Sequence, residues 1–327
     1  MVFQVISGFL LTFLFTNSTQ EAYSSIILGE VNLSGGWLIH LFHSKLASLL
    51  FLFLYLHIFK HLTYGRQRLR QAWTLGGMIL FLSMAVAFLG YSLTYRDMRY
   101  WAATVISNLL GVVPFVGDSL VVWFRADFFV RDGTLKFFFA LHFILPFLIL
   151  VLVAAHVDAL HQGGRSPKRG KNFFVRIVSF QPFLVKDIIN FIFLLFFSFF
   201  VLLFPFFITD ARAFVTANTI KRPRHIQPEW YFLITYALLR SSSHKSLAVL
   251  YLVFVLVFWL FFFPPVSSGR TKKGRLVYFF GVCYFFFALH LSYLGSCTID
   301  AGYVLATSLA SCGLGFLSLV ITFLLWV

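Results

Sequence analysis

Residues 35–65 read GGWLIHLFHSKLASLLFLFLYLHIFKHLTYG, an apolar stretch that contains two histidines fourteen residues apart, His43 and His57. The stretch is long enough to cross a membrane as a single helix. On an α-helix, fourteen residues return to within about 40° of the starting direction over roughly 21 Å. Both histidines therefore project from one helix face, at two different depths.

A second apolar stretch, FFFALHFILPFLILVLVAAHVDALH at residues 137–161, contains His142 and His156 at the same spacing. A lone histidine in an apolar helix is usually a packed core residue or a pore residue. Two equal spacings on two segments instead predict two levels of opposed imidazoles, with one imidazole from each segment at each level. Paired axial imidazoles are the ligands of six-coordinate haem iron. The sequence therefore predicts two haems stacked across a membrane.

The composition is that of a polytopic membrane protein, because 60% of the 327 residues are hydrophobic and 11% are charged. Seven apolar runs are long enough to span hydrocarbon: 37–62, 74–95, 135–160, 183–208, 246–263, 276–294 and 303–326. A shorter uncharged run, 1–15, lacks the basic leader of a secretory signal and is expected to be a truncated first helix. The predicted fold is all-α, with eight transmembrane helices.

The net charge of +15 is unevenly distributed over the connections between these runs. Three short connections are basic and contain no acid: 60–70, 165–176 and 270–275. This asymmetry is typical of membrane topology, with basic loops on the cytoplasmic or matrix side, and it does not indicate nucleic-acid binding. It places His43 and His142 toward the outer face, and His57 and His156 toward the inner face.

The cysteine pattern limits the type of cofactor. Cys283, Cys297 and Cys312 are far apart and predict neither a disulfide framework nor a zinc site. The chain also lacks C-x-x-C-H, which attaches haem covalently, so the predicted haems are of the b type. An electron partner with an iron–sulfur centre or a c-type haem must then be another subunit.

Two glycines in the run 74–95, Gly76 and Gly90, repeat the fourteen-residue interval. Glycine has no side chain, so another group can approach the helix backbone closely. Small residues also serve ordinary contacts between membrane helices. Because the interval matches that of the histidines, we expect this helix to let a flat macrocycle approach at two depths.

Several stretches closely resemble cytochrome b, the core subunit of the respiratory quinol:cytochrome c oxidoreductase (complex III). They are residues 35–65 and 137–161 together with WTLGGMILFLSMAVAFLGY (73–91), YWAATVISNLLGVVPFVG (100–117) and HIQPEWYFLITYALLRS (225–241). PEWY is among the most specific marks of the family. The histidine spacing of fourteen, and the presence of both halves on one chain, favour the respiratory type over the chloroplast type. The resemblance implies a haem-binding four-helix bundle in residues 1–180 and a four-helix part carrying PEWY in residues 181–327.

The resemblance also implies an activity and partners. A quinol, expected to be ubiquinol, is oxidised at the outer face. One electron passes to a Rieske iron–sulfur protein and the other through the two haems b to a quinone at the inner face, coupled to proton translocation. A c-type cytochrome subunit, other complex III subunits, lipids and a second copy of the chain are expected partners. The expected location is the mitochondrial inner membrane, and the 46 phenylalanines suggest an A+T-rich organellar genome.

The resemblance assigns site residues at both faces. The outer quinol site is expected to include Pro228, Glu229, Trp230, Tyr231 and Tyr236, with Phe88 and Tyr91 on the run 74–95. A carboxyl group in such an apolar pocket can accept a proton from quinol. At the inner face, His161 and Asp187 match the quinone-binding pair. His40 stands where the family usually has an arginine that pairs with a haem propionate, and a histidine supplies that charge only when it is protonated.

Alternatives remain open at this stage. Glu229 could cap a short interfacial helix with Trp230 and Tyr231 as membrane-interface anchors, and Asp187 could cap a helix while His161 ends another in water. A two-haem membrane anchor of a quinone-linked dehydrogenase would share the histidine pairs but does not need PEWY. A proton-coupled transporter would explain membrane histidines but not their equal spacings. A redox spectrum separates these alternatives.

Overall fold

The computed structural model describes residues 1–64, 70–162, 181–204, 214–223, 225–261, 272–298 and 300–326. Within these residues the regular elements are helices and no strand occurs, which confirms the predicted all-α class. The α-helices are α1 (Val2–Thr12), α2 (Ala22–Asn32), α3 (Gly36–Tyr64), α4 (Arg70–Leu93), α5 (Asp97–Asn108), α6 (Gly117–Arg125), α7 (Asp132–Gln162), α8 (Gln181–Leu203), α9 (Leu233–Arg240), α10 (Lys245–Phe261), α11 (Lys272–Ser296) and α12 (Ala301–Trp326). Two short 3-10 helices are η1 (Leu109–Val112) and η3 (Trp230–Phe232).

Five of the described helices, α3, α4, α7, α11 and α12, are long and apolar enough to cross a membrane. Three shorter apolar helical stretches lie in α1, α8 and α10. Each of the eight segments predicted as spans therefore contains a described helix, and length and composition support five full spans among the described residues. Large apolar side chains such as Val151 on α7 and Phe196 on α8 are 65% and 64% exposed, as expected where lipid is the solvent.

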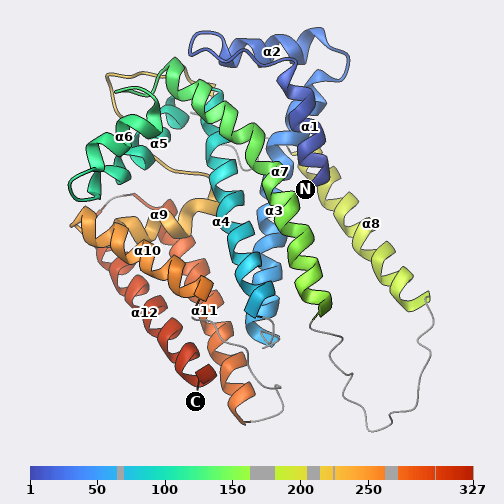
Figure 1. Cartoon of the computed structure of the whole chain (residues 1–327), viewed down its shortest axis with the longest axis vertical. Coiled ribbons are helices and arrows are strands. Elements are labelled where there is room, and N and C mark those ends of the chain that lie inside the picture. Colours follow the sequence, from blue (N-terminus) through green and yellow to red (C-terminus); the bar gives the residue numbers. More distant parts are fainter. Residues whose placement is uncertain are drawn as a thin grey trace.

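The histidine-bearing helices belong to a bundle of α1, α3, α4 and α7 (Figure 1). α4 packs along α7, and α1 packs against the amino-terminal half of α3. The fourteen-residue spacing keeps His43 and His57 on one face of α3, while His142 and His156 lie on one face of α7. The bundle thus brings two apolar helices, each with two imidazoles, to opposite sides of one interior.

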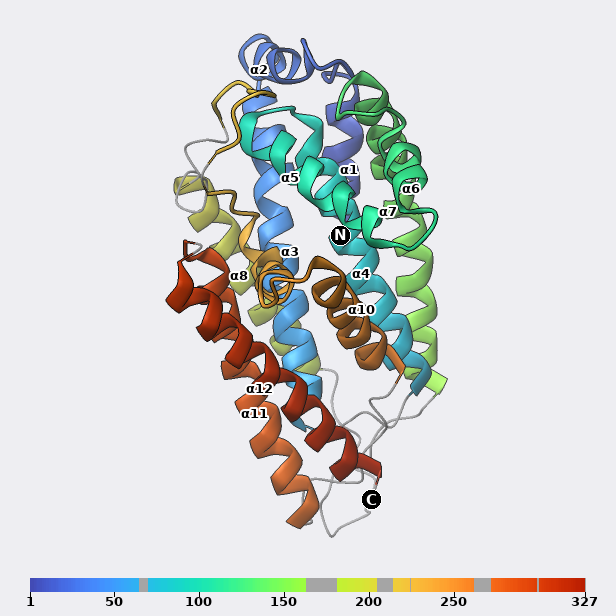
Figure 2. The same ribbon diagram turned by 90° about the vertical axis from the view of Figure 1, so that its left-hand side faces the viewer.

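The connection from α4 to α7 covers the end of this bundle that the loop charges predict to face outward. There α5, η1 and α6 form a layer of surface helices, and α2 lies across the same end (Figure 2). Arg125 of α6 is buried and holds the layer together by donating hydrogen bonds to Ser107 Oγ at 2.8 Å and Asn108 Oδ1 at 2.7 Å. A buried cation is tolerated when its N–H groups are hydrogen-bonded, and here the acceptors of the Arg125 guanidinium are neutral oxygens.

The carboxyl-terminal helices α9 to α12 pack around a second core that includes Ala237, Leu291 and Leu314, all at most 2% exposed. Arg240 at the end of α9 donates to the carbonyl oxygens of Gly295 and Cys297 at 3.2 and 2.9 Å, which ties α9 to the end of α11. This packing holds the segment before α9 against α3. The predicted boundary between the two parts, at residue 180, lies outside the described residues.

Candidate functional site: two histidine pairs and an outer cavity

The four predicted histidines form the two expected pairs. The ring centroids of His43 and His142 are 6.1 Å apart, and those of His57 and His156 are 6.4 Å apart. An imidazole nitrogen lies about 2.0–2.1 Å from a bound metal, so one metal between two imidazoles places their centroids roughly 6.3 Å apart. Both pairs fit this spacing. Two imidazoles supply only two of the six ligands of an octahedral iron, so the pairs suit a metal that carries its other four, as haem iron does.

A hydrogen bond fixes the orientation of one outer imidazole. His142 Nδ1 lies 2.8 Å from the carbonyl oxygen of Val86 on α4. A carbonyl oxygen can only accept, so Nδ1 carries the proton and Nε2 keeps its lone pair. Such outer partners orient ligating histidines and raise their basicity. The inner His156 differs, because its buried Nδ1 has no hydrogen-bond partner.

Three glycines allow the imidazoles to approach neighbouring helices. A Cβ added to Gly90 would lie 2.9 Å from both ring nitrogens of His142 and closer still to Cε1. A Cβ on Gly8 would lie 2.7 Å from His43 Cε1, and one on Gly76 would lie 3.1 Å from His156 Cε1. Gly76 and Gly90 therefore lie beside His156 and His142, one at each histidine level, and the expected approach of a macrocycle to them stays a prediction. Gly90 lies one turn after Val86, so it also opens the Val86 carbonyl to His142.

Alanine substitutions at these glycines should have graded effects. We expect Gly90→Ala to remove most of the outer haem, because its Cβ would overlap the His142 ring. Gly76→Ala should reduce binding of the inner haem less, since the added Cβ would lie 3.1 Å from His156 Cε1, a few tenths of an ångström closer than usual. Gly302→Ala, which meets nothing within 4 Å, is the matched control. Haem content resolved by low-temperature α bands measures the effect, and equal losses in all three variants would contradict this ordering.

A cavity of about 570 Å³ lies beside the outer pair. Its lining includes His43, His142, Gly8 and Gly90 at one side, and Glu229 with Tyr231, Lys45 and Arg99 at another. The volume falls in the range of cofactor and small-molecule sites. The outer imidazoles and the PEWY segment, far apart in sequence, therefore share one cavity.

Hydrogen bonds and stacking hold the PEWY segment against α3. Tyr231 stacks on Phe51 with ring centroids 4.2 Å apart, and Tyr55 donates from its hydroxyl to the Tyr231 carbonyl at 2.6 Å. The Phe232 N–H donates to the Glu229 carbonyl at 2.8 Å, forming the turn that begins η3. Burial, assisted by the nearby Glu229 carboxylate, raises the pKa of the Tyr231 phenol well above its usual range.

Two cationic residues, Lys45 and Arg99, line the cavity together with Glu229. Lys45 on α3 interacts electrostatically with Glu229, and the guanidinium carbon of Arg99 lies 5.2 Å from the centre of the Tyr91 ring. Nearby cations stabilise the ionised form of a carboxyl group. Glu229 therefore shares the cavity with a cation that interacts with it, and its predicted role as a proton acceptor stays a prediction.

The other predicted outer residues have different surroundings. Pro228 and Trp230 are half-buried beside Glu229, and the buried Nε1 of Trp230 has no hydrogen-bond partner. Tyr236 does not line the cavity and instead donates to the Ile226 carbonyl at 2.8 Å, which fixes the PEWY loop. Phe88 is buried against Phe138 with ring centroids 5.8 Å apart, also outside the cavity lining. Their predicted roles in quinol binding stay predictions, with Tyr236 and Phe88 placed as supporting residues.

The two residues predicted for the inner quinone site lie on α7 and α8. His161 is exposed near the end of α7. Asp187 lies in α8, but its side chain is outside the described residues, so the predicted pair stays a prediction. Nearby, the ring centroid of His61 lies 4.6 Å from that of His57, the predicted ligand.

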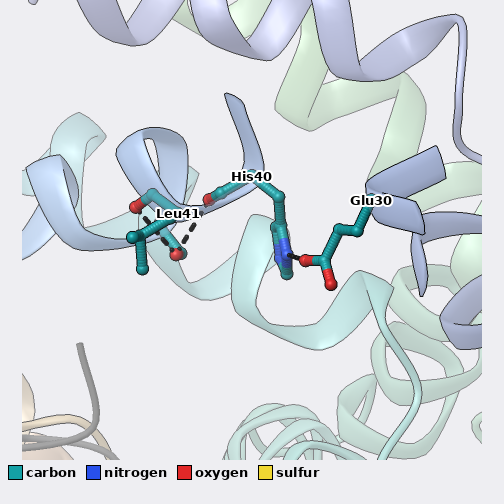
Figure 3. A network of polar contacts seen from close by, with 4 residues as sticks. Glu30, His40 and Leu41 are labelled. Carbon is teal, nitrogen blue, oxygen red and sulfur yellow. Dashed lines mark hydrogen bonds and ion pairs between the residues drawn. The ribbon is translucent and has the colours of Figure 1, made fainter. Parts of the chain in front are cut away.

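His40 has a partner that the sequence analysis did not identify. Its Nδ1 and Oε1 of Glu30 form a short ion pair between α3 and α2 (Figure 3). Both residues line the outer cavity. The expectation that His40 pairs with a haem propionate stays a prediction. The sequence shows only that Glu30 precedes His40 by ten residues, with Gly35 and Gly36 between them, which does not by itself predict a contact.

Comparison with known proteins places the chain in a family. The family model described as cytochrome b/b6/petB matches residues 1–164, and that described as cytochrome b(C-terminal)/b6/petD matches residues 216–314. Cytochrome b of Caenorhabditis elegans is 39% identical over 98% of this chain and 88% of the relative. Cytochrome b of Apis mellifera ligustica is 42% identical over 84% of this chain and 73% of the relative.

The fold is also similar to a solved structure. A chain of a hyperthermophilic respiratory complex III superposes with a TM-score of 0.88 at 23% identity, covering 99% of this chain and 88% of that one. At this identity the match supports the fold. Sequence similarity to the curated relatives runs through both the histidine bundle and the PEWY segment, and the chain therefore belongs to the cytochrome b family.

Proposed function

We propose that this chain is the central catalytic subunit of a quinol:cytochrome c oxidoreductase, respiratory complex III. The observation that carries the proposal is the pair of opposed imidazoles at each of two levels, with centroid separations of 6.1 and 6.4 Å. Family membership and the fold of the complex III chain support it. His43 with His142, and His57 with His156, would hold two haems b. Bound haems supply one-electron transfer between the two faces of the membrane.

Quinol oxidation would take place in the outer cavity. Oxidising a quinol to a quinone releases two electrons and two protons, so the site needs a proton acceptor. Glu229 takes that role, since it lines the cavity, and a positioned carboxylate is an effective general base. Lys45, which interacts electrostatically with Glu229, would favour the ionised, proton-accepting form of the carboxylate before the reaction. Tyr231, kept neutral and stacked on Phe51, forms an apolar wall that limits water access.

Quinone reduction would take place near the inner pair, with His161 and Asp187 as hydrogen-bonding and proton-donating residues. Other subunits would complete the electron path. A Rieske protein and a c-type cytochrome are the expected acceptors, because the sequence has no motif for either centre. We further propose a homodimeric core in the mitochondrial inner membrane, with ubiquinone as the quinone. The identified animal relatives support this location.

The test is a haem count on the purified complex. A dithionite-minus-ferricyanide spectrum and a pyridine haemochrome assay should give two non-covalent haems b per copy of this chain. Quinol added to the complex should reduce both haems and cytochrome c. One haem, or none, would contradict the assignment of the two histidine pairs.

A further inference from the structure

Ser7 of α1 makes three close contacts through its hydroxyl oxygen. Oγ lies 2.6 Å from the carbonyl oxygen of Phe3, 3.3 Å from that of Gln4, and 3.1 Å from His43 Nδ1. The side chain is buried, with 9% of its surface exposed. Ser7 is thus an internal polar group that joins α1 to an expected outer iron ligand.

The number of protons decides the direction of the bond to His43. A serine hydroxyl has one proton and two lone pairs. The short contact with the Phe3 carbonyl requires Ser7 to donate there, since the carbonyl can only accept. Ser7 must then accept at its contact with His43, which requires Nδ1 to carry the imidazole proton. His43 Nε2 is therefore left with the lone pair that binds a metal.

Two neighbouring features hold this contact in place. Gly8 follows Ser7, and a Cβ there would lie 2.7 Å from His43 Cε1, so only glycine allows the ring to rest against α1. Gln4 Nε2 donates to the His43 carbonyl at 2.9 Å, which fixes α1 against α3 at the same level. Gln4, Ser7 and Gly8, which lie within about one turn on one side of α1, therefore all contact or support His43.

We infer that Ser7 is a positioning residue for the outer haem iron, acting through His43. It selects the Nδ1–H tautomer, orients the ring and makes the imidazole a stronger electron donor, as acceptors behind ligating histidines do. The inference rests on the proposed function, because it requires His43 to ligate iron. The inner level provides an internal reference, since the buried His156 Nδ1 has no such acceptor.

The test is a redox titration of both haems in the assembled complex carrying Ser7→Ala. Loss of the acceptor makes His43 a weaker donor, which destabilises ferric iron and raises the outer midpoint potential. We expect the reduction equilibrium of the outer haem to shift about three- to tenfold, or roughly 30–60 mV at 59 mV per tenfold for one electron. The inner midpoint should not change. Ser7→Thr keeps the hydroxyl and should retain the wild-type value.

The control is Ser92→Ala, which removes another buried serine hydroxyl that bonds only its own helix at the Phe88 carbonyl. Equal shifts in Ser7→Ala and Ser92→Ala, or no outer shift in Ser7→Ala, would overturn the inference. If Ser7→Ala does not assemble, Ser7→Cys decides, because its sulfur is a weak acceptor and should also raise the outer midpoint. Wild-type complex without two haems would instead refute the proposed function, so the two failures are distinguishable.

Discussion

Replacing His156 by leucine should remove the inner haem and leave most of the outer one. His156 faces His57 at a centroid distance of 6.4 Å, so the substitution deletes one of two axial ligands at that level alone. A haem held by a single imidazole in a site shaped for two loses a strong metal bond. The total haem signal should fall by about half, since one of two sites is lost. Pyridine haemochrome assays and low-temperature α bands measure this directly.

Substitutions at the other predicted ligands test which histidines share a haem. His57→Leu should reproduce the spectrum of His156→Leu, whereas His142→Leu should remove the outer haem instead. His290→Leu is the control, because His290 is another histidine on a membrane helix, exposed on α11. Loss of both haems in every variant, including this control, would mean that the histidines support folding rather than ligation.

The sequence predicted the features that depend on local periodicity. Apolar run length located α3, α4, α7, α11 and α12 to within a few residues, because lipid requires long uninterrupted apolar helices. The fourteen-residue intervals predicted which histidines face each other, since helix geometry fixes their direction. The same interval pointed to Gly76 and Gly90 as residues at the depths of the two histidine pairs. It could not predict what fills the space beside each glycine, which depends on the ring orientation of a residue on another helix.

Contacts between distant segments were not predictable in this way. Ser7 and His43 are separated by 36 positions, and Tyr55 and Tyr231 by 176 positions. α1 is apolar on nearly all sides, so periodicity gave no reason to aim Ser7 at a histidine. The Glu30–His40 ion pair depends on how α2 turns across the bundle end, which apolar patterning does not describe. The resemblance supplied the role of Glu229, whereas the structure supplied Lys45 and Arg99 beside the same cavity.

Substituting Glu229 by glutamine should slow quinol oxidation by up to about hundredfold, the effect expected on losing a general base. Glutamine keeps the size and one carbonyl acceptor, so the cavity and the Tyr231 stack on Phe51 should persist. Stopped-flow reduction of the Rieske centre and the outer haem measures the rate. The wild-type rate should also fall at low pH, where the carboxylate is protonated, and this dependence should be absent from the variant.

Two comparisons separate chemistry from folding at Glu229. Asp118→Asn alters an exposed acid on α6 that does not line the cavity, so quinol oxidation should keep its wild-type rate. Reduction of the inner haem by quinol, measured with the outer site inhibited, should also be unaffected in Glu229→Gln, since the predicted topology places that reaction at the opposite face. Haem content should stay at two per chain. If both half-reactions slowed equally, Glu229 would be a structural residue of the PEWY loop, because a proton acceptor confined to the outer cavity cannot limit chemistry on the other side of the membrane.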